Sequence, residues 1–479
     1  MKKLLFVGAE AMPFAATGGL GDVLGSLPAA LKRAAGDELD VRVVIPLYGT
    51  VSDKYRSEMT LLREFNVRLA WRNLYCGVKS LVKDGVTYYF IDNEYYFKRG
   101  SKLYGEYDDG ERYAYFCTAV MRMMQELGFY PDILHAHDWQ AALTVIYLNR
   151  QYRHSCEFSH MKSVFTIHNI EYQGQYGFEI LGDVFGLSGF DRATVEYNGC
   201  INLMKGAVEC ADAVTTVSPT YAEEIKYPQY SHKLYHALLK NDYKLTGILN
   251  GIDYDYYNPG TDPAIAQHYT SKSVARKAAN KLAFQKEMQL PERRDVPMIA
   301  IVSRLAAHKG LDLVTESVYR LLEEDVQFVL LGSGDAHFES FFRVLEGQFR
   351  DKVRSIIKYD RDLSKRIYAA ADIFLMPSLT EPCGLSQMIA SRYGAVPVTR
   401  ETGGLFDSIK GYWEDENGIH GNGFTFANYN AAELTDRSLA AINLYHDAKK
   451  WKKLVERVMS VDFSWDKSAK TYLEMYGKL

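Results

Sequence analysis

The strongest constraint on the fold is a pattern of short apolar runs separated by helix-forming segments. In the first half of the chain, the runs with the length and composition of buried strands are 4–9, 41–47, 87–92, 132–137 and 163–168. The segments with helical periodicity between them are 21–35, 111–127 and 139–151. This alternation is typical of βαβ units, whose parallel strands are buried on both faces. We therefore predict a doubly wound α/β domain in this half.

The same pattern starts again in the second half. The apolar runs there are 299–305, 327–332, 372–378 and 396–400, and the helix-forming segments lie near 310–324, 335–350, 363–371 and 385–393. The chain has 479 residues, which is too long for one compact core, because domains average about 100–200 residues. We therefore predict two Rossmann-like, doubly wound domains that face a deep cleft.

The predicted domain limits follow a polar connection that begins at residue 248. This connection, ILNGIDYDYYNPGTDP, is rich in Gly, Pro, Asn and Asp, which are typical of loops and turns. We expect a first domain at 1–247, a second domain at 248–458, and a C-terminal helix within 459–479 that packs back on the first domain.

Composition and charge exclude several classes of protein. The chain has 56 Lys and Arg against 60 Asp and Glu, a net charge of -4, so nucleic acid is not an expected partner. No run of about 18 apolar residues is present, and we expect no membrane partner. The N-terminal apolar run is interrupted by Gly8 and Glu10, which favours a first strand over a signal peptide. The six cysteines form no CxxC pair, which is typical of reduced thiols in a cytoplasmic protein.

Ligands of such sheets bind outside the carboxyl ends of the strands, where this chain has glycine-rich and polar segments. The first strand is followed by Gly18, Gly19 and Asp22 at the start of a helix. Glycines allow a ligand to approach the backbone, and amides at a helix N-terminus bind phosphate. Because the segment does not fit GxGxxG, a tight turn without a ligand remains the alternative.

Two cations and a carboxylate follow strands of the second half. Arg304 and Lys309 lie five residues apart before a helix, an arrangement that predicts a diphosphate site without a metal. Glu381 lies between a strand and a helix, where it could bind sugar hydroxyls or an oxocarbenium-like centre. Solvated surface cations and a favourable charge at a helix start are the alternatives. We expect Cys383 to pack at the site rather than act as a nucleophile.

Two short patterns could indicate a metal. His135 and His137 share one face of a strand and could chelate an ion, but no third ligand follows at a recognisable spacing. Asp253 and Asp255 form a DxD pattern, which we interpret as a turn because it lies in the polar connection. The segment at 332–337 fails the GxGxxG pattern of dinucleotide sites. We predict neither a metal nor a cofactor.

Taken together, several segments resemble the bacterial glycogen and plant starch synthases, glycosyltransferase family 5, which have the GT-B fold. The matching blocks are TGGLGDVLGSLP (17–28), HAHDWQA (135–141), TIHNIEYQG (166–174), ILNGID (248–253), SRLAAHKG (303–310), FLMPSLTEPCGLSQM (374–388) and RYGAVPVTRETGGLFD (392–407). Each block alone is a weak signal, but their number and order are specific. The resemblance covers nearly the whole chain.

The resemblance implies functions for individual residues. Gly18 and Gly19 would approach the donor phosphates, with Asp22 supporting their loop. The sugar pocket would be lined by Asp138, His168 and Asn250. Arg304 and Lys309 would hold the diphosphate. Glu381 would contact the transferred glucose, with Cys383, Gly384 and Leu385 beside it and Tyr359 stacked near the adenine.

The resemblance also implies a reaction. The expected enzyme is a retaining glucosyltransferase that moves glucose from ADP-glucose to the non-reducing end of an α-1,4-glucan in glycogen biosynthesis and releases ADP. The expected catalytic group comprises Glu381, His168, Asp138, Arg304 and Lys309. The nucleotide-sugar would bind the second domain, and the first would take the acceptor.

Two departures from family patterns bear on this expectation. Many members have a lysine where this chain has Ala16, so no cation reaches the phosphates from that loop, and the choice of donor stays open. Many other retaining GT-B transferases have Glu-x7-Glu, but here the eighth residue after Glu381 is Ile389, as in glycogen synthases. The alternatives are another retaining GT-B transferase, a glucan phosphorylase, for which no pyridoxal phosphate block is found, and an inactive glucan-binding protein.

Overall fold

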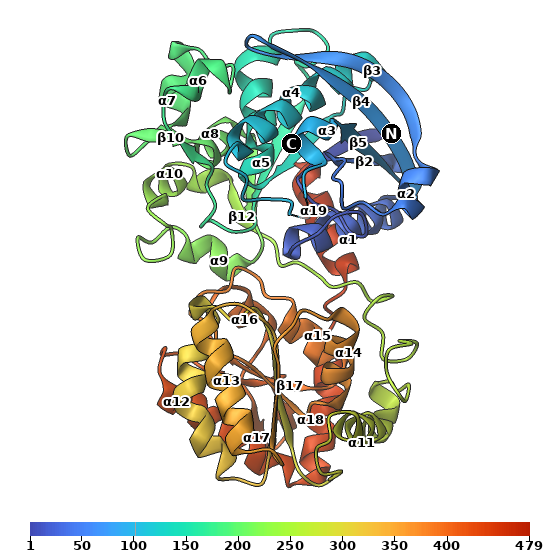
Figure 1. Cartoon of the computed structure of the whole chain (residues 1–479), viewed down its shortest axis with the longest axis vertical. Coiled ribbons are helices and arrows are strands. Elements are labelled where there is room, and N and C mark those ends of the chain that lie inside the picture. The colour runs from blue at the N-terminus through green and yellow to red at the C-terminus, as the bar shows by residue number, and fades with distance from the viewer. Residues whose placement is uncertain (101) are drawn as a thin grey trace. The chain divides into compact units, whose positions relative to one another are not determined.

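The computed structural model describes residues 1–100 and 102–479, which form two compact units. The first unit comprises residues 1–251 and 465–479, and the second comprises residues 252–464. Each unit has its own sheet with helices on both faces (Figure 1). None of the helices formed by the described residues combines the length and the apolar composition that a membrane span requires.

The first unit is built on a nine-stranded sheet of order β12-β11-β7-β6-β1-β2-β5-β4-β3. Its parallel strands are β1 (Lys2–Val7), β2 (Leu39–Pro46), β5 (Val86–Asp92), β6 (Ile133–His137), β7 (Lys162–Ile167), β11 (Ala213–Thr216) and β12 (Leu245–Gly247). The central strand β6 is buried along its whole length. Burial on both faces explains why these strands are continuous apolar runs in the sequence.

Helices of the first unit connect these strands. The longest are α1 (Gly19–Ala35) and α4 (Asp109–Leu127), and α5 (Asp138–Tyr147) and α8 (Leu203–Cys210) follow β6 and β10 (Cys200–Asn202). The C-terminal helix α19 (Trp465–Gly477) packs along α1 (Figure 1). Its Tyr476 makes two hydrogen bonds to other segments of the first unit. The Tyr476 carbonyl accepts a bond from Lys2 Nζ at 2.7 Å, and the Tyr476 hydroxyl bonds His135 Nδ1 at 2.7 Å.

One edge of this sheet was not predicted from the sequence. Strands β3 (Thr60–Leu69) and β4 (Arg72–Lys83) form an antiparallel hairpin that pairs with β5. Most side chains of β3 are exposed, so the strand lacks a buried apolar face. The turn uses Ala70 at a positive φ of 51° instead of the Asn-Gly or Asp-Gly pair that marks a hairpin in sequence.

The second unit has a six-stranded parallel sheet of order β15-β14-β13-β16-β17-β20. The strands are β13 (Met298–Val302), β14 (Gln327–Leu331), β15 (Val353–Ile356), β16 (Ile373–Met376), β17 (Val396–Arg400) and β20 (Phe424–Phe426). Helices α12 (Leu311–Leu322) and α13 (Ala336–Gln348) lie on one side of the sheet, and α11 (Lys277–Glu287), α14 (Arg361–Ala370) and α18 (Ala448–Ser460) lie on the other (Figure 1). Two further helices are α15 (Ser386–Arg392) and α17 (Ala431–Tyr445).

Both sheets have the doubly wound topology that the sequence predicts. In each sheet the first strand along the chain lies in the middle, β1 in one and β13 in the other. The chain fills one side of that strand and then crosses to the other side, at β6 and β16 respectively. Ligands of such sheets bind where the strand order reverses. The fold therefore predicts ligand sites at the loops that follow β1, β6, β13 and β16.

Candidate active site

The glycine-rich segment lies at the switch point of the first unit, between β1 and α1. Thr17, Gly18 and Gly19 are exposed, and no atom lies within 4 Å of the point where a Cβ on Gly18 or Gly19 would stand. A ligand could therefore approach this backbone closely. Asp22 follows in the first turn of α1, where a carboxylate is favoured by the helix dipole.

A buried carboxylate that sequence reasoning missed holds this loop in place. Glu10 is 3% exposed. Its Oε2 accepts bonds from the amides of Thr17 at 2.6 Å and Gly18 at 3.3 Å, and its Oε1 accepts from the hydroxyls of Thr17 at 2.6 Å and Tyr104 at 2.6 Å. The only signal in the sequence was an acidic residue directly after a buried strand. The bonds make Glu10 the anchor of the glycine loop.

The loop after β6 joins the loop after β7. Asp138 begins α5 with a positive φ of 58°, and its Oδ1 accepts the amide of His168 at 2.7 Å. Burial raises the pKa of Asp138 to about 7, although bonds from the amides of His168 and Asn169 act in the opposite direction. The structure thus brings Asp138 and His168 together, as the resemblance implies, through a backbone bond.

Three histidines form a bonded cluster beneath this loop. His137 Nδ1 lies 2.9 Å from His168 Nε2, and the rings of His135 and His137 stack at 4.2 Å. Burial lowers the pKa of His168 to about 3, so its imidazole is neutral at pH 7. Among the described residues His168 Nδ1 has no protein partner, which leaves one ring nitrogen for a ligand hydroxyl.

One histidine of the pair that could have held a metal has both ring nitrogens bonded to protein groups. His135 bonds Tyr476 through Nδ1 at 2.7 Å and Thr166 through Nε2 at 2.6 Å. Across the part of the chain that the structure describes, no group of three His, Cys, Asp or Glu has the arrangement of a metal site. The DxD pattern forms a turn, as predicted, since Asp253 Oδ1 accepts the amides of Asp255 at 2.9 Å and Tyr256 at 3.0 Å.

Buried polar atoms without a partner in the described structure include two beside the predicted sugar-binding residues. They are Oδ1 of Asn250 and Nε2 of His137. Asn250 is 5% exposed and follows β12, the edge strand beside β11. Buried polar groups are nearly always hydrogen-bonded, and an exception needs an explanation such as a ligand or water.

At the switch point of the second unit, the predicted lysine and glutamate form an ion pair. Lys309 Nζ lies 2.7 Å from Oε2 of Glu381, which is 6% exposed, and Ser378 Oγ donates to the same oxygen at 3.0 Å. Gly310 has a positive φ of 71°, and a Cβ there would stand 2.1 Å from the carbonyl oxygen of Pro377. Only glycine allows this close approach, which places Lys309 beside the loop after β16.

Arg304 supplies a second cation at the same edge. It follows β13, it is exposed, and its guanidinium has no ion pair among the described residues. Lys309 directly precedes Gly310, the N-cap of α12. Two cations near a helix N-terminus form an electropositive site suited to phosphate.

The remaining predicted residues lie on two loops of this edge. Cys383 is buried, and Gln387 Nε2 donates to the carbonyls of Cys383 at 3.1 Å and Gly384 at 2.9 Å, which fixes the chain before α15. Leu385 is the N-cap residue of α15. Tyr359, between β15 and α14, is 78% exposed, and its hydroxyl accepts a bond from Arg361 Nε at 2.6 Å. Its ring is therefore available for stacking.

Comparison with known proteins assigns this arrangement to a family. The starch synthase catalytic domain model matches residues 3–241, and the model of glycosyl transferases group 1 matches residues 284–457. A glycogen synthase of Geobacillus thermodenitrificans is 47% identical over 100% of this chain and 98% of its own length. The chain belongs to the glycogen and starch synthase family. A glycogen synthase of Bacillus anthracis, 45% identical over 99% of both chains, agrees with this assignment.

A solved structure extends the similarity to three dimensions. The catalytic domain of starch synthase IV from Arabidopsis thaliana, bound to ADP and acarbose, superposes with a TM-score of 0.91 and 36% identity, over 100% of this chain and 99% of the other. Family membership confirms the predicted GT-B fold and glycosyltransferase activity. It also implies a nucleotide-sugar donor and a glucan acceptor.

Proposed function

We propose that the chain transfers glucose from ADP-glucose to the non-reducing end of an α-1,4-glucan such as glycogen, with release of ADP and retention of the α configuration. The observation that supports it most is the site in the second unit. There, Lys309 and Glu381 form an ion pair at the switch point of a Rossmann-like sheet, beside the N-cap of α12, and Arg304 follows the central strand β13.

The two cations act on the leaving group in this proposal. As the bond between glucose C1 and the phosphate oxygen breaks, negative charge grows on the diphosphate. Arg304 offers a planar fork of donors and Lys309 a compact charge. Lys309 donates one of its three N–H groups to Glu381, and the other two can bind a phosphate oxygen. Preorganised charges of this kind are usually the largest contribution to catalysis.

Glu381 and the neighbouring loop hold the reacting glucose. One carboxylate oxygen is bound by Lys309 and Ser378, and Oε1 has no protein partner in the described structure. That oxygen is available to a sugar hydroxyl or to the positive charge developing at C1. The acceptor hydroxyl then attacks C1 on the face that the phosphate leaves, and its proton passes to the departing phosphate.

The other predicted site residues have functions of their own in this proposal. We propose that the amides of Gly18 and Gly19 bind the diphosphate and that Asp22 supports their loop. His168 and the buried Oδ1 of Asn250 bind glucose hydroxyls. The Asp138 carboxylate holds His168 in place by accepting a bond from the backbone amide of His168. Tyr359, which lies between β15 and α14 of the second unit, stacks on the adenine.

The test is a comparison of two donors with glycogen as the acceptor. We expect glucose incorporation with ADP-glucose to exceed that with UDP-glucose, and the new linkage to be α-1,4. A preference for UDP-glucose would overturn the donor assignment. Nucleotide release without chain extension would overturn the acceptor. Absence of turnover with either donor, together with binding of glycogen, would favour the inactive glucan-binding alternative.

A further inference from the structure

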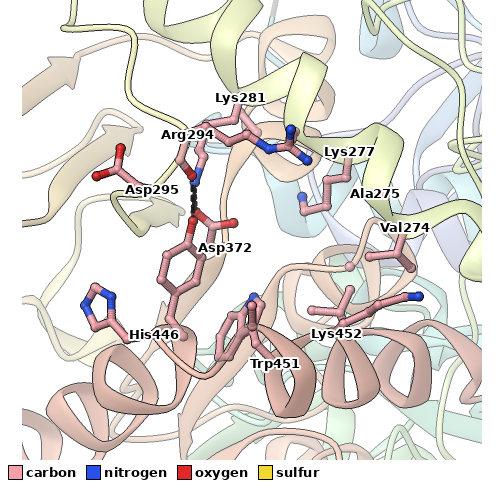
Figure 2. A pocket seen from close by; sticks show the side chains of 16 residues that line it. Val274, Ala275, Lys277, Lys281, Arg294, Asp295, Asp372, His446, Trp451 and Lys452 are labelled. Atoms are coloured by element: carbon pink, nitrogen blue, oxygen red, sulfur yellow. Dashed lines mark hydrogen bonds and ion pairs between the residues drawn. The ribbon is translucent and has the colours of Figure 1, made fainter.

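The second unit contains a cavity to which the proposed reaction gives no function. Its volume is about 560 Å³, which lies within the range of about 300–1,000 Å³ typical of small-molecule sites. It is bordered by α11, by the end of α17 and by α18, and its lining includes Lys277, Lys281, Arg294, Trp451 and Lys452 (Figure 2).

The cavity lies at the amino ends of the strands of this sheet, whereas the proposed donor site lies at their carboxyl ends. Asp295, Asp372 and Gly394 line it, and they precede β13, β16 and β17 respectively. Arg304 and Glu381 follow β13 and β16. Because the strands are parallel, the residues before them and the residues after them lie at opposite ends of the sheet. A ligand in the cavity would therefore not contact the donor-binding residues.

Lys277 is a buried cation that lacks a carboxylate of its own. It is 6% exposed, and its Nζ donates to the carbonyls of Tyr368 at 3.0 Å and Ala369 at 2.7 Å. These carbonyls belong to the last turn of α14, so Lys277 caps that helix. No carboxylate forms an ion pair with it among the described residues, and its third N–H has no protein acceptor. Burial lowers the pKa of Lys277 to about 7.

The acidic residues of the cavity are already engaged elsewhere. Asp372 binds Lys281 at 2.7 Å and accepts the amide of Met298 at 2.9 Å. Lys281 is saturated, because its Nζ also donates to the carbonyl of Val296 at 2.8 Å and the hydroxyl of Tyr445 at 2.7 Å. Asp295 pairs with Arg293 at 2.9 Å. The charge of Lys277 is left uncompensated.

Two further cations border the same space. Arg294 is exposed, and its guanidinium has no ion pair in the described structure. Lys452 is largely exposed, with only a loose contact to Glu456 at 3.7 Å. With Lys277 they form an electropositive lining, and the amide of Ala448 at the start of α18 adds the positive end of a helix dipole.

The rest of the lining is apolar or aromatic. Trp451 is 8% exposed and packs edge-to-face on Tyr445 with the ring centroids 5.4 Å apart. The small apolar residues of the lining include Val274, Ala275, Ala278, Ala370 and Val455. An inorganic phosphate would occupy only a small part of this volume and would leave the apolar walls without a contact. The cavity therefore favours a ligand in which the anion is attached to a ring or a carbon skeleton.

We propose that this cavity is a second ligand site, which binds a phosphate monoester carried by a sugar or a nucleoside. The phosphate contacts Lys277, Arg294 and Lys452, and the ring packs against Trp451 and the apolar wall. The site is independent of the proposed transfer reaction, and its test does not require turnover.

The experiment is calorimetric titration of the full chain with ribose 5-phosphate and with AMP, and with inorganic phosphate and ribose as comparisons. We expect at least one ester to bind more tightly than phosphate, and ribose not to bind. Arg294→Ala and Lys452→Ala should each weaken ester binding by about threefold to tenfold, because each removes one partly exposed charged contact. Lys453→Ala is the matched control, since Lys453 is the exposed neighbour of Lys452 on α18 and lies outside the lining.

Proton uptake gives a second readout. At pH 8 the ester is a dianion and Lys277 is mostly neutral, so a bound phosphate that restores its charge should draw up to one proton from the buffer. Titrations in two buffers of different ionisation heat measure this uptake, which should vanish in Lys277→Met and persist in His446→Gln. The other titratable groups near Lys277 are Asp372, Lys281 and Tyr269, whose ring centroid lies 5.9 Å from Lys277 Nζ. Tyr445 and His446 also line the cavity.

Several results would overturn the proposal. One is the absence of ester binding at millimolar concentration. Another is equal affinity for inorganic phosphate, which would remove the function of the apolar wall. A third is equal weakening by Lys453→Ala and Lys452→Ala, which would indicate nonspecific surface charge. If Lys277→Met does not fold because α14 loses its cap, the Arg294 and Lys452 variants decide the question.

Discussion

Replacing Glu10 by glutamine should loosen the glycine loop without removing any group that touches the donor. In the wild type, Oε2 faces the amides of Thr17 and Gly18, and Oε1 faces the hydroxyls of Thr17 and Tyr104. Backbone amides only donate, whereas hydroxyls can turn and accept. The glutamine should therefore direct its oxygen toward the amides and its NH₂ toward the hydroxyls.

The magnitude follows from the change in these bonds. Bonds to a charged group contribute about 1.5–3 kcal/mol and neutral ones about 0.5–1.5 kcal/mol. The two amide bonds thus lose about 1 kcal/mol each, and the exposure of Thr17 and Gly18 lets water replace part of the loss. We expect the free energy of unfolding to fall by about 1–2 kcal/mol. If the same energy orders the loop for binding, the KM for the donor rises by about 5- to 30-fold.

The assay is a donor saturation curve with glycogen in excess, combined with urea denaturation. The turnover number should fall less than the affinity, because a saturating donor orders the loop again. Tyr104→Phe removes one of the four bonds and should have a smaller effect on both measurements. The matched control is Glu64→Gln, because Glu64 accepts a tyrosine hydroxyl at 2.8 Å on the exposed hairpin. A Glu10→Gln enzyme with lower stability and an unchanged KM would refute the proposed function of the anchor.

Three other predictions concern the proposed active site. Glu381→Gln should lower turnover by on the order of 100- to 1000-fold, since a preorganised contact worth about 3–4 kcal/mol is lost; near-normal turnover would exclude Glu381 from the site. Activity should persist in EDTA, because two cations bind the diphosphate; recovery only on addition of magnesium or manganese would contradict this arrangement. The raised pKa of Asp138, about 7, favours its protonated form in the folded state. The stability of the wild type relative to Asp138→Asn should therefore be greatest below pH 4 and fall as the pH rises to 7, by up to about 1.4 kcal/mol per unit; equal urea midpoints across that range would contradict the shift.

The parts of the fold that could be predicted are those in which burial dictates the sequence. Strands such as β6 and β13 are buried on both faces and appear as apolar runs between helices. The hairpin of β3 and β4 was missed because β3 is the outermost strand and most of its side chains are exposed. Such a strand does not need the apolar residues that mark a buried strand in the sequence. The packing of a C-terminal helix on the first domain was predicted, but its contacts were not, such as the bond between Tyr476 and a histidine of β6.

The site shows a similar division. Arg304, Lys309 and Glu381 could be found because they follow strands, where ligands of parallel sheets bind. The pairing of Lys309 with Glu381 could not, because it depends on the close approach at Gly310 of two loops that lie about 70 residues apart in the chain. Glu10 was missed because one acidic residue after a strand has no distinctive spacing. The histidine pair stayed ambiguous until both nitrogens of His135 were found to be bonded.

Replacing Ala16 by lysine tests the departure of this chain from its family. A Cβ on Gly21 would stand 2.4 Å from Ala16 Cβ and 3.1 Å from Glu10 Oε2, so the side chain at position 16 faces the first turn of α1 beside the anchor carboxylate. A lysine side chain at position 16 would extend past Gly21, which has no side chain to obstruct it, and Ala16 is partly exposed. The protein should therefore stay folded. The new charge would be drawn both to the donor phosphate and to Glu10, and it would oppose the dipole of α1 by about 0.3–1 kcal/mol.

These opposing terms limit the gain from that lysine. We expect the wild type to be active and Ala16→Lys to lower the KM for the donor by about twofold to fivefold, within the range of an exposed ion pair, with turnover unchanged. Ala16→Met supplies a chain of similar length without charge and should leave KM as it is. The measurement is a donor saturation curve for the three proteins at matched salt, because screening weakens exposed pairs. An inactive wild type that lysine restores would mean that Ala16 marks a degenerate site, and glucan binding without catalysis would then be the better assignment.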